Sequence, residues 1–195
     1  MKTFLVGVTG VIASGKSTAC RYFQDERGFV WLDADHITHE LYQKGGQGYT
    51  KIKEYFGDYY VGKTEVHRNR LRALVAKNHQ KMWILNKVIH PIIWNEVSKK
   101  IDQLKAQYKR EQRDLKVCLE AFYLEPGDVG TFCDRILCID APNDRILQRL
   151  KERGLPADEA KEILTFQRKI QPKNFTEVIM NDTSPEAFKS KLSTL

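Results

Sequence analysis

The feature that most constrains the fold is a glycine-rich segment, GVIASGKS at residues 10–17, which matches the pattern G-x-x-x-x-G-K-S in full. It follows an apolar run at residues 3–8, typical of a buried strand, and precedes a helical pattern that starts near Ser17 and runs to about residue 24. Glycines allow backbone angles that turn successive N–H groups inward, and a helix start adds partial positive charge at the same point. The segment therefore predicts a phosphate-binding loop between a strand and a helix.

Two side chains of this segment carry chemistry of their own. Lys16 is expected to reach the β- and γ-phosphates of a nucleoside triphosphate, and the hydroxyl of Ser17 is expected to ligate Mg²⁺. The match is complete and lies between a strand and a helix, so a chance glycine-rich turn is a poor alternative.

The rest of the chain predicts an α/β core interrupted by helices. Four further strands are predicted at residues 29–32, 116–119, 135–139 and 177–180. The first two strands and the helix between them form a βαβ unit, so the sheet begins parallel. Residues 35–110 are helical, with a loop at Gly45, Gly46 and Gly48 and with Pro91 at the start of a long helix. Later helices are predicted at residues 143–153, 158–167 and after Ser184.

An acidic pair, Asp33 and Asp35, follows the second predicted strand. A carboxylate at this place can accept the proton of a hydroxyl that attacks the γ-phosphate. We favour Asp35 as this general base. For Asp33 a catalytic role, the positioning of a water on Mg²⁺, and the capping of a helix that starts at Ile37 remain equal alternatives.

Several basic residues allow two interpretations of their role. Arg145, Arg149 and Arg153 recur every four residues on one predicted helix face, which is either solvated or a clamp for phosphate. His90 either caps and packs or touches the acceptor substrate. Lys173 belongs either to a solvated loop or to a mobile lid.

Composition narrows the possible partners. Lys and Arg number 32 and Asp and Glu 25, giving a net charge of +7 and a sequence pI of about 9.2. This excess favours an anionic partner, but no paired aromatic platform for bases is present, so we expect no nucleic acid. No apolar run approaches the roughly 18 residues of a membrane span. Four cysteines without a C-x-x-C pair favour reduced, buried thiols and a cytoplasmic protein.

Several motifs in the same order resemble the dephospho-coenzyme A kinase family over most of the chain. They are GVTGVIASGKST at residues 7–18, GFVWLDAD at 28–35, IHPI at 89–92, DAP at 140–142 and VIMN at 178–181. Val11 stands where that family usually has a second glycine, which requires a negative φ. The segment EAFYLEP at residues 120–126 replaces a PLLFE-like stretch, and the lid is about two residues shorter and lacks arginine.

The resemblance implies a three-layer P-loop kinase fold with a five-stranded, mostly parallel sheet. It implies a nucleotide core (residues 1–34, 113–152 and 176–195), a helical acceptor domain (35–112) and a lid (153–175). It implies an enzyme, a phosphotransferase that moves the γ-phosphate of ATP, with Mg²⁺, to the ribose 3′-hydroxyl of dephospho-coenzyme A. The implied residues form three sets: catalytic Asp35, Lys16 and Arg149; nucleotide-binding Gly10, Ala13, Ser14, Gly15, Lys16, Ser17, Thr18, Arg149, Arg153 and Asn181; and acceptor-binding Asp33, Asp35, His90 and Lys173.

Two alternatives remain at this stage. One is a P-loop kinase for another nucleotide or nucleoside hydroxyl, and the other is a non-catalytic module that binds ATP or nucleic acid. We expect small-molecule substrates as the only partners, and a monomer or a small homo-oligomer.

Overall fold

The computed structural model describes residues 2–124 and 133–194. The chain forms two compact units, one made of Met1–Asp33 with Leu104–Leu195 and the other of Ala34–Gln103. The first unit holds a parallel sheet with helices around it, and the second is helical. The strands are β1 (Thr3–Thr9), β2 (Val30–Asp33), β3 (Leu115–Glu120), β4 (Arg135–Asp140) and β5 (Glu177–Met180). The helices are α1 (Lys16–Arg27), α2 (Ala34–Leu41), α3 (Gln47–Phe56), α4 (Arg68–Lys77), α5 (His79–Arg110), α6 (Asn143–Glu152), α7 (Ala157–Ile170) and α8 (Pro185–Ser193), with a 3₁₀ turn η1 at Asp58–Tyr60.

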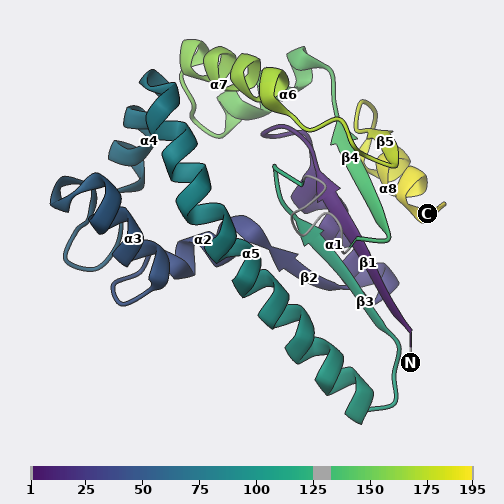
Figure 1. Ribbon diagram of the computed structural model, residues 1–195. Coiled ribbons are helices and arrows are strands. Elements are labelled where there is room, and N and C mark those ends of the chain that lie inside the picture. The colour runs from purple at the N-terminus through teal and green to yellow at the C-terminus, as the bar shows by residue number, and fades with distance from the viewer. Residues whose placement is uncertain (1, 125–132, 195) are drawn as a thin grey trace. The chain divides into compact units, whose positions relative to one another are not determined.

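The five strands lie in the order β2-β3-β1-β4-β5, and every pairing between them is parallel (Figure 1). The predicted α/β fold with a five-stranded sheet is therefore confirmed. β1 is the central strand, with β3 on one side of it and β4 on the other. Ligands on such sheets bind beyond the carboxyl ends of the strands, where the order reverses. The glycine-rich segment follows β1 at this point.

One face of the sheet is covered by α1 and α8. Their buried residues pack with those of β1, β3, β4 and β5 in a single apolar cluster: Val6, Val8, Ala19, Cys20, Phe23, Phe29, Cys118, Leu137, Ile139, Ile179, Phe188 and Leu192. Ser184 caps α8 by accepting a hydrogen bond from the N–H of Ala187 at 3.2 Å, and Pro185 follows as its first residue. The predicted start of this last helix is confirmed.

A second apolar cluster packs against the glycine-rich segment. Val11 and Ala13 are buried against Ile146 and Leu150 of α6 and against α7, with Ala160, Leu164 and Ala141 completing the group. Burial of such aliphatic groups contributes roughly 0.8 kcal/mol per methylene. The segment predicted as a lid therefore contains a helix, α7, that packs through its buried face beneath the loop.

The helical unit has its own core around Tyr42, Ile52, Val66, Leu71 and Ile89. Here two sequence expectations are wrong. Pro91 does not start the long helix but lies inside α5, twelve residues after its first residue. Proline removes one backbone hydrogen bond, and in a 32-residue helix the buried side chains on both sides of it outweigh that loss.

The second correction concerns the residues after β2. The helix expected from Ile37 begins at Ala34, directly after the strand, so Asp35 lies in its first turn. Asp33 is the last residue of β2. No helix in the described ranges combines the length and the apolar character that a bilayer span requires.

Candidate functional site

The loop between β1 and α1 has a backbone that only glycine fits at two positions. Gly10 has φ +145° and Gly15 has φ +114°. A Cβ atom at Gly10 would overlap the carbonyl oxygen of Ile139, and one at Gly15 would overlap Nδ2 of Asn181. Val11, in contrast, has no positive φ, since Ala13 and Gln112 are the non-glycine residues with that geometry in the described chain. The replacement of the family's second glycine by Val11 is therefore tolerated, as expected.

The start of α1 is open to an anion. Gly15 precedes it in a left-handed conformation, no described side chain caps it, and its first turn contains no acidic residue. Side chains such as Ser or Asp usually satisfy the first N–H groups of a helix. Here those groups, with the positive end of the helix dipole, point to the loop and are available to phosphate oxygens.

Two side chains hold the loop from within the first unit. Nζ of Lys16 donates to the carbonyl oxygen of Val11 at 3.2 Å, so the ammonium lies over the loop. The N–H of Ile12 donates to Oε1 of Gln167 on α7 at 2.6 Å. Gln167 is one of the residues that carry the family resemblance, but sequence reasoning assigned it no role, because a glutamine near the end of an amphipathic helix looks like any solvated residue.

Arg149 and Asn181 brace the outer side of the same loop. The Arg149 guanidinium donates to the carbonyl oxygens of Ala13 (3.0 Å), Ser14 (3.2 Å) and Asn181 (3.1 Å). The buried amide of Asn181 donates to Ser14 O at 2.8 Å. Both predicted nucleotide-binding residues therefore lie at the loop and fix its shape. Their contacts to phosphate, and a catalytic contact from Arg149, stay predictions.

The electrostatics around Arg149 are those of a cation cluster. Partial burial, followed by the nearby guanidiniums of Arg145 and Arg153, lowers the pKa of Arg149 from its ordinary value. Guanidinium stays charged at neutral pH, so the cluster is a region of positive potential beside the loop. Arg145 is exposed on α6, and Arg153, also exposed, is the residue after that helix. Of the three arginines predicted on one helix face, Arg145 and Arg149 therefore lie within α6, and Arg153 is the residue that caps its C-terminus.

A carboxylate approaches the loop from the end of β3. Glu120 is 7% exposed, and its Oε1 accepts a hydrogen bond of 2.8 Å from the hydroxyl of Ser17. In the sheet Glu120 lies beside Asp33 of β2 on one side and Val8 of β1 on the other. Its segment was notable in the sequence only as a departure from the family pattern; Glu125 and Pro126 lie outside the described residues.

The acidic pair is divided between the two units. Asp33 ends β2 at the carboxyl edge of the sheet, and Asp35 is an exposed residue in the first turn of α2. His90 is also in the helical unit, where its ring lies 6.3 Å from that of Trp94. Their roles toward the acceptor stay predictions.

The remaining cations of the predicted lid differ in their contacts. Lys173 is exposed after α7. Arg168, which the sequence did not distinguish, forms an ion pair with Asp140 at 2.8 Å and donates to the carbonyl oxygen of Ala141 at 3.0 Å. Arg168 therefore fastens the last turns of α7 to the end of β4.

Burial determines the direction in which the pKa values of two cysteine thiols are shifted. It raises the pKa of Cys133 to about 12 and that of Cys138 to about 11, in each case with a nearby aspartate adding to the effect. None of the four cysteines, all within the described residues, forms a disulfide, and Cys20, Cys118 and Cys138 are buried. These are the reduced, buried thiols that the sequence predicts.

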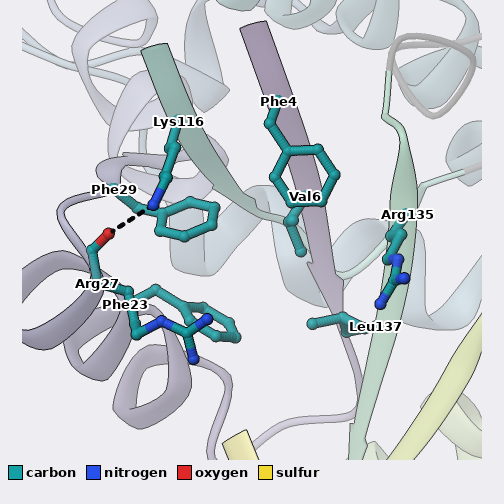
Figure 2. Close-up of a pocket in the computed structure, with 8 residues that line it drawn as sticks. All are labelled: Phe4, Val6, Phe23, Arg27, Phe29, Lys116, Arg135 and Leu137. Carbon is teal, nitrogen blue, oxygen red and sulfur yellow. Dashed lines mark hydrogen bonds between the residues drawn. The ribbon is translucent and has the colours of Figure 1, made fainter. Parts of the chain in front are cut away.

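A cavity of about 90 Å³ lies at the opposite, amino-terminal edge of the sheet (Figure 2). Its lining combines aromatic and aliphatic side chains with three cations: Phe4, Val6, Phe23, Phe29, Leu137, Arg27, Lys116 and Arg135. Lys116 donates to the backbone oxygen of Arg27 at 3.4 Å, and Arg27 donates to that of Ser193 at 2.9 Å. Lys116 and Arg27 thus connect segments of the fold, and the cavity lies away from the loop.

The loop fits a nucleotide phosphate with Mg²⁺. The hydroxyl of Ser14 is fully buried in it and has no hydrogen-bond partner among the described residues. Ser17 offers an oxygen beside a buried carboxylate, and carboxylate and hydroxyl oxygens are the donors that Mg²⁺ prefers. The described residues contain no cluster of three or more His, Cys, Asp or Glu side chains that would hold a metal by itself. A metal here would take some of its ligands from the phosphate oxygens, as Mg²⁺ usually does.

Comparisons with known proteins agree with this geometry. The model of the family described as dephospho-CoA kinase matches residues 4–186. A dephospho-CoA kinase from Idiomarina loihiensis is 30% identical over 99% of this chain and 93% of its own length. The crystal structure of TT1252 from Thermus thermophilus has a TM-score of 0.76 at 24% identity, covering 100% of this chain and 96% of that one. A dephospho-CoA kinase from Campylobacter jejuni has a TM-score of 0.62 at 24% identity, covering 98% and 94%.

Proposed function

Because the chain belongs to the dephospho-CoA kinase family, we propose that it transfers the γ-phosphate of ATP to the ribose 3′-hydroxyl of dephospho-coenzyme A. The products are coenzyme A and ADP, and the reaction is the last step of coenzyme A synthesis. The observation that carries the proposal is the match over residues 4–186 together with a phosphate loop whose glycines, helix start and lysine are all in place.

The loop binds and orients the triphosphate. In this proposal the N–H groups at the start of α1 donate to the phosphate oxygens, and Lys16 exchanges its bond to Val11 O for the β- and γ-phosphates. Arg149 and Asn181 keep the loop in shape through its carbonyl oxygens, and in this proposal Arg149 also adds positive charge as the phosphoryl group moves. Positioning and charge stabilisation supply most of the rate in phosphoryl transfer.

Mg²⁺, when bound, neutralises charge on the β- and γ-phosphate oxygens and helps to align the phosphate chain. Ser17 is the residue of this chain that would hold it. The remaining work of the protein is to orient the acceptor and to accept its proton.

Asp35 is proposed as the proton acceptor. Only Ala34 separates it from Asp33, so covalent geometry limits the distance between the Cα atoms of the two aspartates to about 7 Å. Asp33 in turn neighbours Glu120, whose carboxylate accepts from Ser17. An exposed carboxylate in the first turn of α2 can accept the hydroxyl proton while the ribose oxygen attacks the γ-phosphate.

The acceptor is tested by direct competition. Protein, Mg²⁺ and ATP are incubated separately with dephospho-coenzyme A, nucleoside monophosphates and shikimate, and both ADP and the phosphorylated product are quantified. We expect a kcat/KM for dephospho-coenzyme A at least about 10³-fold above any other acceptor, because the site would hydrogen-bond a specific ribose hydroxyl. Turnover of a nucleoside monophosphate without turnover of dephospho-coenzyme A would instead establish a kinase for another nucleotide hydroxyl.

The role of Asp35 is tested by Asp35→Asn. The change removes the proton acceptor and keeps the shape, so kcat should fall by about 10²–10⁴-fold while ATP affinity stays within twofold. Steady-state kinetics and calorimetric titration with ATP measure the two quantities. Asp58→Asn is the matched control, since Asp58 is an exposed carboxylate of the same unit whose described partner is Lys53 at 2.9 Å. Equal activity of the two variants would show that Asp35 does not act as the proton acceptor.

We propose further that the enzyme acts in the cytoplasm on small-molecule substrates, as a monomer or small homo-oligomer, without binding nucleic acid. Four cysteines without a disulfide, and a basic cluster already engaged at the phosphate loop, support this view. Retention on an immobilised polynucleotide at 0.15 M salt would contradict it.

A further inference from the structure

The sheet face that α1 and α8 cover becomes charged at its amino-terminal edge. Residues two apart on a strand face the same side of a sheet, so Arg135 of β4 shares the face of Leu137, a member of the apolar cluster under these helices. Lys116 of β3 shares it in the same way with Cys118. Strands of a parallel sheet are usually apolar on their covered faces. Two cations at this place therefore need an explanation.

The two cations flank the central strand. Lys116 pairs in register with Phe4 of β1, and Arg135 pairs with Val6. Both line the cavity at this edge, and Arg27 of α1 is the third cation around it (Figure 2). None of the eight lining residues is acidic, and no ion pair joins the three cations to a carboxylate within the part of the chain that the structure describes. Like charges gathered in this way repel one another, so an anion would be attracted here.

The three cations differ in the contacts that they already make. Lys116 lies over the Phe29 ring and donates to the backbone oxygen of Arg27. Arg27 in turn donates to the backbone oxygen of Ser193. Arg135 is exposed, and its guanidinium has no hydrogen bond, ion pair or ring contact with another described residue. Arg135 is therefore the cation that can reorient toward a ligand at no cost in existing contacts.

The floor of the cavity is apolar. Its buried members are Val6, Phe23, Phe29 and Leu137. Arg135 and Lys116 are exposed, so their charges lie toward the opening. Small-molecule sites commonly have this form, an apolar hollow with a few polar groups that fix the orientation of the ligand. The arrangement fits a ligand that is apolar at one end and anionic at the other.

The volume limits the apolar end of such a ligand. An apolar cavity of about 150 Å³ accommodates benzene. The cavity here measures about 90 Å³, so it accommodates a group of about four carbon atoms. A short aliphatic chain has this size, whereas an aromatic ring or a nucleobase is too large.

The fold favours a carboxylate over a phosphate as the anionic end. α1 ends at Arg27, beside the cavity, so the partial negative charge of its last carbonyl groups lies at this edge. That charge opposes a doubly charged phosphate, which binds best at a helix start, as at the loop before α1. A guanidinium, in contrast, pairs with a single carboxylate through two parallel hydrogen bonds.

We propose that this cavity is a binding site for a short aliphatic carboxylate, with the hydrocarbon chain on the apolar floor and the carboxylate paired with Arg135. The site lies at the edge of the sheet opposite the phosphate loop and is separate from it. The ligand fills an apolar hollow and offsets the repulsion among three cations. It therefore stabilises the folded protein by binding to it.

Pentanoate, a straight-chain carboxylate of the expected length, is the probe. It is titrated into the whole chain labelled at valine and leucine methyl groups, and the nuclear magnetic resonance signals of Val6 and Leu137 are followed. We expect saturable shifts with a Kd of about 1 mM or lower, which is within reach of a well-fitting ligand of this size. From acetate to pentanoate, each added methylene should strengthen binding about two- to fourfold. Without saturable shifts at these two residues the proposal is wrong.

Two further compounds separate the apolar end from the charged end. 1-Pentanol keeps the chain without the charge and should bind at least about fivefold more weakly than pentanoate. Inorganic phosphate keeps the charge without the chain and should leave the two methyl signals in place. Equal affinity for pentanol and pentanoate would overturn the role of the cations. Tighter binding of phosphate than of pentanoate would overturn the carboxylate assignment.

Arg135→Gln tests the pairing of the carboxylate. We expect pentanoate affinity to fall about fivefold or more, because a charge-assisted bidentate contact is lost. The stability of the ligand-free variant to urea should stay the same or rise, since one of three like charges is removed. Arg21→Gln, at an exposed arginine of α1 outside the cavity lining, is the matched control and should change neither quantity. Unchanged pentanoate affinity in Arg135→Gln would contradict the proposal.

Val6→Ile tests the apolar floor without altering any charge. It adds one methylene to a side chain that lines the cavity, so pentanoate affinity should fall at least about threefold while the protein stays folded. Wild-type affinity in this variant would mean that the chain does not enter the cavity.

Saturating ADP distinguishes this site from the phosphate loop. Because the two lie at opposite edges of the sheet, pentanoate affinity should stay within twofold when ADP is bound. Competition between the two ligands would place the carboxylate at the loop and overturn the proposal. None of these measurements involves turnover, so they are decided independently of the proposed function.

Discussion

The two edges of the sheet both gather cations, but they use them differently. At the carboxyl edge, Lys16 and Arg149 donate to carbonyl oxygens of the loop that precedes α1. At the amino edge, Lys116 lies 5.7 Å from the centre of the Phe29 ring and donates to the backbone oxygen of Arg27 (Figure 2). Only the carboxyl edge combines positive side chains with an uncapped helix start among the described residues.

This difference shows why a basic composition is weak support for any particular site. Side-chain ammonium and guanidinium groups are satisfied by ring faces and carbonyl oxygens wherever the fold brings them together. A phosphate site needs, in addition, backbone donors fixed toward one point before the ligand arrives. The following predictions test this contrast.

The largest effect is expected from a matched pair of lysines. Lys16→Ala should lower kcat/KM for ATP by about 10²–10³-fold and weaken ATP binding, because it removes a preorganised cation at the transferred phosphate. Lys116→Ala removes an equal charge at the amino edge and should change kcat/KM less than threefold. Steady-state kinetics with both substrates measures both variants. Similar losses would mean that overall charge, and not the loop, governs nucleotide binding.

A smaller effect is expected from two glycines. Gly10→Ala places a Cβ against the Ile139 carbonyl oxygen at φ +145° and should lower the free energy of unfolding by about 3 kcal/mol. Gly28 follows α1 with φ +69°, and no described atom lies within 4 Å of a Cβ built there. Gly28→Ala should therefore cost only about 1 kcal/mol, from backbone strain alone. Urea unfolding measures the two values, and a reversed order would contradict the close approach seen at Gly10.

The smallest effect concerns thiols before and within β4. Burial raises the pKa of Cys133 to about 12 and of Cys138 to about 11. At pH 8 the thiolate fraction of Cys138 is about one thousandth, so iodoacetamide should react slowly. Because alkylation needs the thiolate, its rate should rise about tenfold per pH unit up to pH 10 in the folded protein. Peptide mapping by mass spectrometry follows each cysteine, and rapid reaction of Cys138 at pH 8 would show that it is more accessible than the structure indicates.

Much of the fold could be predicted because its patterns are local. The apolar runs at the five strands and the glycine spacing of residues 10–17 depend on neighbours in sequence, and the structure confirms them. Local rules were misleading at Pro91, which reads as a helix start but lies within α5. There, packing of side chains on both sides decided the outcome.

The sequence predicted the part of the site that depends on backbone geometry, and the family resemblance added Arg149 and Asn181, which lie at the loop. Lys16, Ser17 and the glycines follow from one motif. Gln167, Arg168 and Glu120 are single polar residues in otherwise ordinary segments, and their contacts to Ile12, Asp140 and Ser17 span sequence separations that no local pattern encodes. Asp35 stays a prediction.

By itself the sequence determined that a phosphate loop joins a strand to a helix, because glycine spacing and hydrophobic periodicity act over a few residues. The tertiary structure alone decided which side chains surround that loop. Parallel strands bring Glu120, Ile139 and Asn181 to it from β3, from β4 and from the residue after β5, and burial and hydrogen bonding select among the polar residues that meet there.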